Sequence, residues 1–465
     1  MSGTEIRTGL TAGTARKIGH FGRFVTVRGF LRLLGFVYFI AFFSFGPQAL
    51  GLIGSHGILP YGNYLTALRE EFGRAAWRYA PTLLWLAPTD AAFTAVWIVG
   101  AAAALLALFG KWQRPALAVC LVLWLSICSV GQDFLGFQWD ALLVEAGFLA
   151  VFASRSPVRI WLFRWLIFRL MFFSGVVKLA SGDPNWRNLT ALHFHYETQP
   201  LPNPVSWYMY QLPMAFQQVS TALVLVAELA VPLLFFLPRR FRHVGAWITI
   251  GLQTLIFCTG NFTYFNILAV ALTMWLFIEP DPRVRPNPVD IGLAVIVGAL
   301  SLLLCLQLFS VPLPPGGDAL LRFAGPFDVV NSYGLFAVMT TERDEILVEG
   351  SNDGSNWRAY EFKYKPGPLD RPPPVVAPFQ PRLDWQMWFA ALGSYRQNRW
   401  FVNFAVRLLQ GEPAVTHLLA YDPFAGSHPK YIRARLFRYD FTHFGEKGWW
   451  TREEKGIYMP AVSLR

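Results

Sequence analysis

Charged side chains are scarce in this 465-residue chain. Asp, Glu, Lys and Arg make up 15% of the residues, whereas 54% are hydrophobic, and the mean hydropathy is +0.36. Soluble domains usually carry roughly a quarter charged residues, so this composition excludes an ordinary soluble enzyme and indicates a membrane protein. The formal net charge is nevertheless +11. The positions of the basic residues must therefore decide whether nucleic acid is a partner.

Cysteines and catalytic motifs are also few. No cysteine lies in residues 312–465, so no disulfide framework is expected there, and the absence of a C-x-x-C pair argues against thiol–disulfide exchange. The chain has no P-loop, G-x-G-x-x-G, H-E-x-x-H or Ser-His-Asp arrangement, which leaves hydrolase and nucleotide chemistry without support. The four cysteines, all in hydrophobic stretches, are Cys120, Cys128, Cys258 and Cys305.

Long apolar runs are what the sequence has in abundance. A membrane-spanning helix needs about 20 mostly apolar residues, and several segments meet that length. We predict a polytopic α-helical membrane bundle of about nine spans within residues 1–311, with the count inside 115–154 and 243–279 open by one span each. The first run is long and lacks a small-residue cleavage site, so we expect no cleavable signal peptide. The nine segments are 29–50, 91–110, 115–132, 138–154, 157–181, 213–237, 243–259, 262–279 and 289–311.

Basic residues cluster between these runs and set the predicted orientation. Cytoplasmic loops of membrane proteins carry an excess of Lys and Arg. The basic stretch before the first run places the N-terminus in the cytoplasm, and residues 51–90, 182–212 and 312–465 then face outward. The positive charge is thus a topology signal, and we expect no nucleic-acid partner. The residues concerned are Arg7, Arg16, Lys17, Arg23 and Arg28, followed in the loops by Lys111, Arg114, Arg155, Arg159, Arg239, Arg240, Arg242, Arg283 and Arg285.

The composition changes after residue 311, where a Pro/Gly stretch ends the last run. We predict that residues 312–465 form an outward-facing β-rich domain with a helical insertion. Alternating and β-branched residues predict strands, and an Asn-Asp-Gly sequence predicts a turn. The expected elements are a β-rich stretch at 333–340, a strand and turn at 346–354, a returning strand at 357–364, an extended Pro-rich connector at 371–381, helix at 384–410 and a strand at 430–441.

Six ionisable residues fall inside predicted spans, where each is costly unless it is paired or hydrated. From the helical rise of about 1.5 Å per residue, we expect an outer tier of Asp140 with Lys178. An inner tier should bring carboxylates level with Arg164 and Arg169. Ion pairs that only fix helix packing are the alternative to a functional role. Lys178 is the candidate for chemistry because it opens onto the longest polar loop of the membrane half. The inner carboxylates are Glu145 and Glu228.

That polar loop concentrates residues that could bind or react. In an extended backbone, His193, His195 and Glu197 would share a face and could ligate a metal. Hydrogen-bonded structure is the commoner use of such histidines, so we predict no metal site. Glycosylation-type triplets begin at Asn188 and Asn261. The candidate loop residues are Asp183, Trp186, His193, His195, Tyr196 and Glu197.

Several long segments resemble lipase maturation factors. The animal members of that family are membrane proteins of the endoplasmic reticulum that help dimeric lipases reach their folded, active form. The resemblance implies a non-enzymatic membrane protein, surrounded by lipid, that assists secreted clients such as lipases. It leaves the cofactor unknown. For a bacterial-type member it implies the inner membrane and a periplasmic C-terminal domain, and for a eukaryote the endoplasmic reticulum with that domain in the lumen. The segments are 137–145, 192–200, 333–342, 348–354, 381–391, 431–434, 439–442 and 449–450.

A second resemblance supports an alternative function. Gly175-Val-Val-Lys-Leu179, followed by Trp186, is similar to the stretch of vitamin K-dependent γ-carboxylase that holds its catalytic base. It implies a membrane enzyme acting on a lipid-soluble cofactor or substrate, with Lys178 as base, and a closed pocket in the outer third of spans four to six. The carboxylase histidine has no counterpart here, so neither the reaction nor a quinone follows from the resemblance.

Aromatic residues between 385 and 404 suggest where a client would bind, because exposed aromatics anchor interfaces. The alternative is that they form the core of the C-terminal domain. The candidate contact residues are Trp385, Trp388, Tyr395, Trp400 and Phe401.

Overall fold

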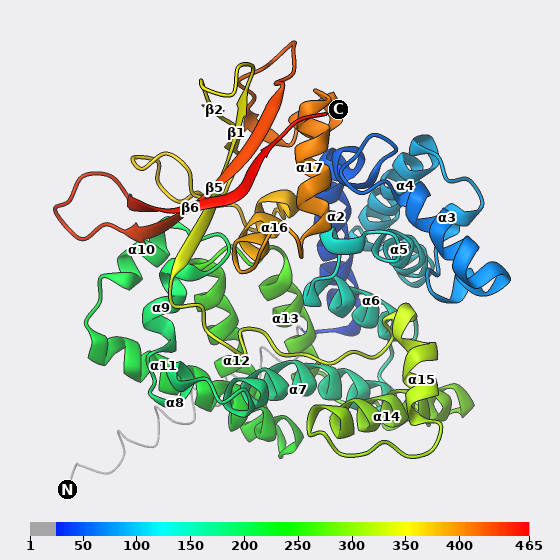
Figure 1. Ribbon diagram of the computed structural model, residues 1–465. Helices are drawn as coiled ribbons and strands as arrows, with labels where there is room; N and C mark the ends of the chain where they lie inside the picture. Colours follow the sequence, from blue (N-terminus) through cyan, green and yellow to red (C-terminus); the bar gives the residue numbers. More distant parts are fainter. Residues whose placement is uncertain (1–24, 465) are drawn as a thin grey trace, which may run out of the picture.

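Each of the nine apolar segments lies largely in helix in the computed structural model, which describes residues 25–464 (Figure 1). Five helices are long and apolar enough to cross a membrane. A polytopic helical membrane protein is therefore confirmed. The basic residues before position 25 lie outside the described residues. The five helices are α2 (Val27–Ile53), α4 (Asp90–Leu108), α7 (Pro157–Ala180), α11 (Met214–Leu229) continued by the 3-10 turn η4 (Val231–Phe236), and α14 (Pro288–Leu308).

The other four segments form shorter or more polar helices, so helix length alone does not support nine spans. At about 1.5 Å per residue, the 14 residues of α6 cover about 21 Å, less than the hydrocarbon core of about 30 Å. These helices are α5 (Gln113–Cys128), α6 (Gln138–Val151), α12 (Arg239–Thr259) and α13 (Phe265–Thr273) with η5 (Met274–Leu276).

Short helices occupy the loops that were expected to face outward. The polar loop after α7 is helical rather than extended, and Asn203 and Ser206 form a capping box at its last helix. Side chains two residues apart point in different directions on a helix. The shared face that an extended backbone would give His193, His195 and Glu197 is therefore not formed. The short helices are α3 (Tyr61–Phe72), η1 (Gly73–Arg78), η2 (Leu83–Trp85), η3 (Gln132–Phe134), α8 (Pro184–Arg187), α9 (Ala191–Thr198) and α10 (Pro204–Tyr210).

The C-terminal region contains an antiparallel four-stranded sheet with the order β2-β1-β5-β6. The strand β1 pairs along its full length with β5, from Arg343 opposite Tyr439 to Ser351 opposite Tyr431. The predicted strands at 346–354 and 430–441 are thus confirmed. The strands are β1 (Arg343–Ser351), β2 (Arg358–Ala359), β5 (Tyr431–Phe441) and β6 (Trp450–Val462), with β3 (Glu361–Phe362) and β4 (Leu419–Tyr421) in a small second sheet.

The predicted helical stretch at 384–410 is confirmed as two helices, whereas the β-rich stretch at 333–340 is wrong. Residues 331–342 form no strand because their polar groups bond to side chains of the membrane half; the Asn331 amide donates to Glu145 of α6 at 3.0 Å, and the Met339 amide donates to Asp183, the N-cap of α8, at 2.6 Å. The returning strand at 357–364 forms only as the short β2 and β3. The remaining helices are α15 (Gly317–Ala324), η6 (Gly325–Phe327), α16 (Arg382–Ala391), α17 (Arg399–Leu409) and α18 (Pro413–Thr416).

One hydrophobic core runs from the membrane helices into the C-terminal region. The helices α16 and α17 lie between the sheet and α2 (Figure 1). Trp385 of α16 packs edge-on against Trp139 of α6 with ring centroids 4.9 Å apart, and Trp400 of α17 packs against Phe134 at 5.7 Å. These contacts hold the C-terminal region directly on the membrane half.

Candidate functional site

Buried polar clusters around Asp140 and Glu145 join the membrane helices to the C-terminal region, and together they are called the polar seam. Arg382, from α16, reaches Asp140 of α6 with its two terminal nitrogens 2.8 and 2.9 Å from the carboxylate oxygens, and both side chains are fully buried. The Tyr264 hydroxyl donates to the same carboxylate at 2.6 Å. The expected pairing of Asp140 with Lys178 is therefore wrong. The counter-ion comes from a region that was predicted to be a separate domain.

A second buried pair lies deeper in the seam. Arg169 of α7 pairs with Glu145 of α6, as the inner tier predicted. The other carboxylate oxygen of Glu145 accepts from the Tyr333 hydroxyl at 2.6 Å and from the Asn331 amide at 3.0 Å. The Asn331 carbonyl in turn accepts from Arg169 at 2.9 Å. This cluster explains why the chain at 331–333 runs along the membrane helices instead of joining the sheet.

The remaining embedded charges pair differently from the prediction. Arg164 donates to the carbonyls of Trp275 and Ile278 at 3.2 and 2.8 Å, and lies 3.9 Å from Glu279. Glu228 is instead the partner of Lys178, whose Nζ lies 2.8 and 2.7 Å from its two carboxylate oxygens. The predicted pairing of Glu228 with an arginine and that of Arg164 with an inner carboxylate are therefore both wrong. The helical rise gives the depth of a side chain but not the direction in which it points, so equal depth did not identify the partners.

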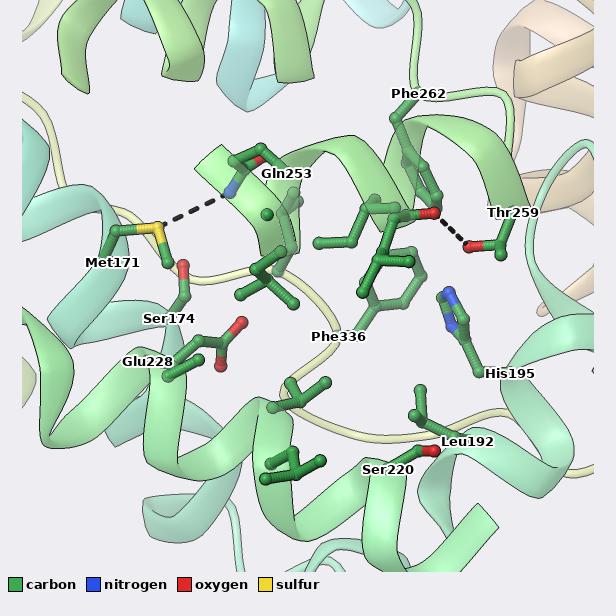
Figure 2. Close-up of a pocket in the computed structure, with 18 of the residues that line it drawn as sticks. Met171, Ser174, Leu192, His195, Ser220, Glu228, Gln253, Thr259, Phe262 and Phe336 are labelled. Carbon is green, nitrogen blue, oxygen red and sulfur yellow. Dashed lines mark hydrogen bonds between the residues drawn. The ribbon is translucent and has the colours of Figure 1, made fainter. Parts of the chain in front are cut away.

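The Lys178–Glu228 pair lines a cavity of about 770 Å³ between α7, α9, α11 and α12. Figure 2 shows Glu228 and Ser174 on one side of this space and His195 on another, with Phe336 between them. Most of the wall is aliphatic or aromatic. The polar lining residues are Ser174, Lys178, His195, Tyr196, Ser220, Glu228, Gln253 and Thr259.

His195 projects from α9 into this cavity (Figure 2). Its ring stacks parallel to Phe262 at 6.0 Å and meets Phe336 edge-on at 4.8 Å. Burial, together with the charge of Lys178, lowers the pKa of His195 to about 4, so the imidazole is neutral near pH 7. His193 lies outside the cavity lining and stacks on Tyr210 at 5.7 Å.

The other predicted loop residues bind the C-terminal region. Trp186 donates to the Phe336 carbonyl at 2.9 Å, and Glu197 accepts from the Phe441 amide at the end of β5. Arg343 of β1 donates to the carbonyls of Glu197 and Pro200, each at 2.9 Å. Within residues 25–464, no group of three or more His, Cys, Asp or Glu side chains is placed to hold a metal ion. Burial raises the pKa of the hydroxyl of Tyr196, the remaining loop candidate, to about 12. The loop as a whole anchors the sheet to the membrane half.

The five candidate client-contact residues lie mostly in the interior. Trp385, Trp388, Trp400 and Phe401 are buried, and Tyr395 is half-buried. The hypothesis that these aromatics form an exposed client contact is therefore wrong, and the alternative that they belong to the core is what the structure shows. Arg382 and Arg343 were not predicted as site residues. Each is a charged residue inside or next to an apolar segment, which was the one available signal.

Fold and seam together define a polytopic helical membrane protein whose C-terminal β-containing region is built into its membrane half. The family model for the lipase maturation factor transmembrane domain matches residues 25–281, and that for the lipase maturation factor C-terminal domain matches residues 329–460. The chain belongs to the lipase maturation factor family.

Relatives from vertebrates match along nearly the whole chain. Lipase maturation factor 2 of Gallus gallus is 35% identical over 582 aligned residues, covering 94% of this chain and 81% of the relative. The Homo sapiens protein of the same name is 35% identical, with 94% and 82% covered. Lipase maturation factor 1 of Mus musculus is 34% identical over 513 residues, with 96% and 88% covered. No solved structure matches the chain.

Proposed function

We propose that this chain is a membrane-embedded, non-enzymatic factor that assists the folding or assembly of secreted client proteins, lipases among them. The observation that carries this proposal is the match of both parts of the chain, 25–281 and 329–460, to lipase maturation factor domains. The names of the relatives supply the client class. The polar seam supports a role in which the membrane helices hold the C-terminal region in one orientation.

The client surface that we propose lies where α10 meets the loop between β5 and β6. Phe444 is 66% exposed and Tyr208 is 53% exposed, and their rings lie 6.3 Å apart. Trp207 meets Phe444 edge-on at 5.2 Å. Exposed aromatic side chains supported by buried ones are the usual anchors of protein interfaces. This aromatic patch replaces the buried aromatics of α16 and α17 as the candidate client contact.

The client role is tested by deleting the gene in its host and measuring secreted lipase activity and the fraction of lipase in folded, assembled form. We expect both to fall and to be restored by the wild-type chain. Phe444→Ser with Tyr208→Ser should restore less, while Val375→Ser, which changes another exposed apolar residue of the same region, should restore fully. Unchanged lipase in the deletion strain would refute the proposal.

We further propose a nine-span topology with a cytoplasmic N-terminus and residues 312–465 outside the cytoplasm. In a bacterial host this places the chain in the inner membrane with a periplasmic C-terminal region; in a eukaryote that region would be lumenal. The basic loops support this arrangement. Alkaline phosphatase fused at the C-terminus should be active, whereas a fusion next to Arg283 should be inactive. The reverse pattern would refute the orientation.

The carboxylase-like alternative gains no support. The Nζ of Lys178 lies 2.8 and 2.7 Å from the two carboxylate oxygens of Glu228, so it is held in an ion pair and not left free as a base. The cavity beside Lys178 lies among α7, α9, α11 and α12, so it involves spans five and six but no residue of α6, the fourth span that the alternative included. Both matching family models describe lipase maturation factors.

A further inference from the structure

The cavity beside Lys178 is reachable from the bilayer. Several of its lining side chains are also exposed on the outer faces of α11 and α12, including Leu223, which is 62% exposed, and Leu255, which is 65% exposed. Because α11 with η4 is long and apolar enough to span a membrane, Leu223 is placed to face hydrocarbon, and Leu255 is exposed on the neighbouring α12. The cavity wall therefore continues onto the lipid-facing side of α11.

The cavity carries no net charge. Lys178 and Glu228 neutralise each other, and His195 is neutral near pH 7. A ligand with a net charge would bring an uncompensated charge into a largely apolar space, which costs several kcal/mol. The electrostatics therefore select an uncharged ligand.

The cavity also contains hydrogen-bonding capacity that the described part of the chain leaves unused. Neither ring nitrogen of His195 has a hydrogen-bond partner within residues 25–464; the ring contacts only the aromatic rings of Tyr196, Phe262 and Phe336 there. The Gln253 amide donates only to the sulfur of Met171, at 3.5 Å (Figure 2). A neutral imidazole offers one donor and one acceptor. A ligand with a hydroxyl or carbonyl group would form a hydrogen bond with this imidazole.

We propose that this cavity binds an uncharged, long-chain lipid drawn from the bilayer, a diacylglycerol or a close analogue. Its hydrocarbon chain would lie along the aliphatic wall, and its hydroxyl or ester carbonyl would bond to His195. The volume of about 770 Å³ falls within the range of about 300 to 1,000 Å³ typical of single-ligand pockets.

The test uses the full chain in phosphatidylcholine nanodiscs with a diacylglycerol probe that carries a photoreactive diazirine in its acyl chain. We expect crosslinks on peptides of α11 and α12 and competition by unlabelled diacylglycerol. Stronger labelling by the matching phosphatidic acid probe would overturn the proposal. So would competition by an isoprenoid quinone but not by diacylglycerol.

Matched glycine variants separate binding from general lipid contact. Gly251 lines the cavity and Gly298 of α14 does not, and a Cβ at either position meets no atom within 4 Å. Gly251→Trp should abolish the crosslinks, and Gly298→Trp should leave them unchanged. Equal crosslinking in the two variants, with both eluting as monodisperse protein, would overturn the proposal.

Matched histidine variants test the polar contact. His195→Phe keeps the ring contacts with Phe262 and Phe336 but removes the hydrogen bond, and should weaken diacylglycerol binding about 2- to 12-fold. His193→Phe, on the same helix but outside the cavity lining, should bind like the wild type. Unchanged binding by His195→Phe would overturn the role of the imidazole.

Discussion

At the scale of single residues, Arg382 is the clearest test of how the two regions are joined. Its guanidinium and the Asp140 carboxylate are fully buried and pair through two hydrogen bonds. Removing one member of a buried pair leaves an uncompensated charge and costs about 3 to 5 kcal/mol. Arg382→Met should therefore lower the melting temperature of the detergent-solubilised protein strongly.

The double variant Asp140→Leu/Arg382→Met is the matched control, because replacing a whole buried pair by apolar residues is often neutral. It should regain most of the lost melting temperature. Arg435→Met breaks a partly exposed pair with Glu454 and a longer contact of 3.6 Å with Glu349, which keeps Arg433 as its partner, and should have little effect. A melting temperature of Arg382→Met equal to that of the wild type would show that the seam does not stabilise the fold.

Glu197 predicts a pH dependence of stability. Burial raises its pKa from 4.5 to about 7, against the opposing influence of the Phe441 amide, Arg343 and Arg438; nearby Asp440 adds to the rise. The folded state then holds a proton between pH 4.5 and 7 that the unfolded state releases, so stability falls as pH rises through this window. The shift corresponds to at most about 3 kcal/mol.

Glu197→Gln removes this titration while its carbonyl can still accept from the Phe441 amide. We expect the variant and the wild type to melt alike below pH 4.5. The variant should be the more stable protein above pH 7, as followed by thermal unfolding across that range. A gap that stays constant with pH would contradict the raised pKa.

At the scale of elements, Asn261 fixes the turn between α12 and α13 to the Pro-rich connector. Its amide nitrogen donates to the carbonyls of Leu201, Pro202 and Pro374 at 3.2, 3.1 and 2.8 Å. Its oxygen accepts from the amides of Val376 and Ala377 at 2.8 and 3.0 Å. Because it is buried, Asn261 is no glycosylation acceptor in the folded chain, whereas Asn188 is exposed.

Asn261→Asp should destabilise the protein, since it turns a donor group into an oxygen that faces three carbonyls. Each buried polar group left unpaired costs about 1 to 3 kcal/mol. Thermal unfolding of Asn261→Asp beside the exposed control Asn188→Asp measures this effect. Equal melting temperatures would mean that the connector is held by other contacts.

The elements that the sequence predicted well are those whose signal is local. Apolar runs and alternating residues identified the helices of the membrane half and the strands β1 and β5, because these patterns depend only on neighbouring residues. The strand β6 was missed because the Arg-Glu-rich stretch 451–455 lacks an apolar alternation. The helix α9 was not predicted, since no pattern in 191–198 distinguished a helical from an extended backbone.

At the scale of the whole molecule, the missing information was which distant segments meet. Arg382 and Asp140 are 242 positions apart, and no local pattern identifies such partners. Likewise, an apolar face on α16 looks the same in sequence whether it meets a client or the membrane helices. The candidate site was therefore predicted as a set of residue types around Lys178, and of its ion pairs only Glu145 with Arg169 was predicted correctly.

A single core predicts that the two regions do not fold separately. Residues 1–311 alone would leave Asp140 without Arg382, Glu145 without Tyr333, and Trp139 without Trp385. We expect this fragment to aggregate or be degraded, because it exposes apolar surface and leaves buried charges unpaired.

Cutting the full chain elsewhere provides the control for this whole-molecule prediction. Residues 443–448 form an exposed loop between β5 and β6, and a protease site inserted there leaves both strands paired. The nicked protein should elute as one particle in size exclusion, whereas the 1–311 fragment should give no monodisperse peak. A monodisperse 1–311 fragment with a wild-type melting temperature would show that the seam joins two independent domains. In that case the membrane helices could not be what fixes the orientation of the client-binding region.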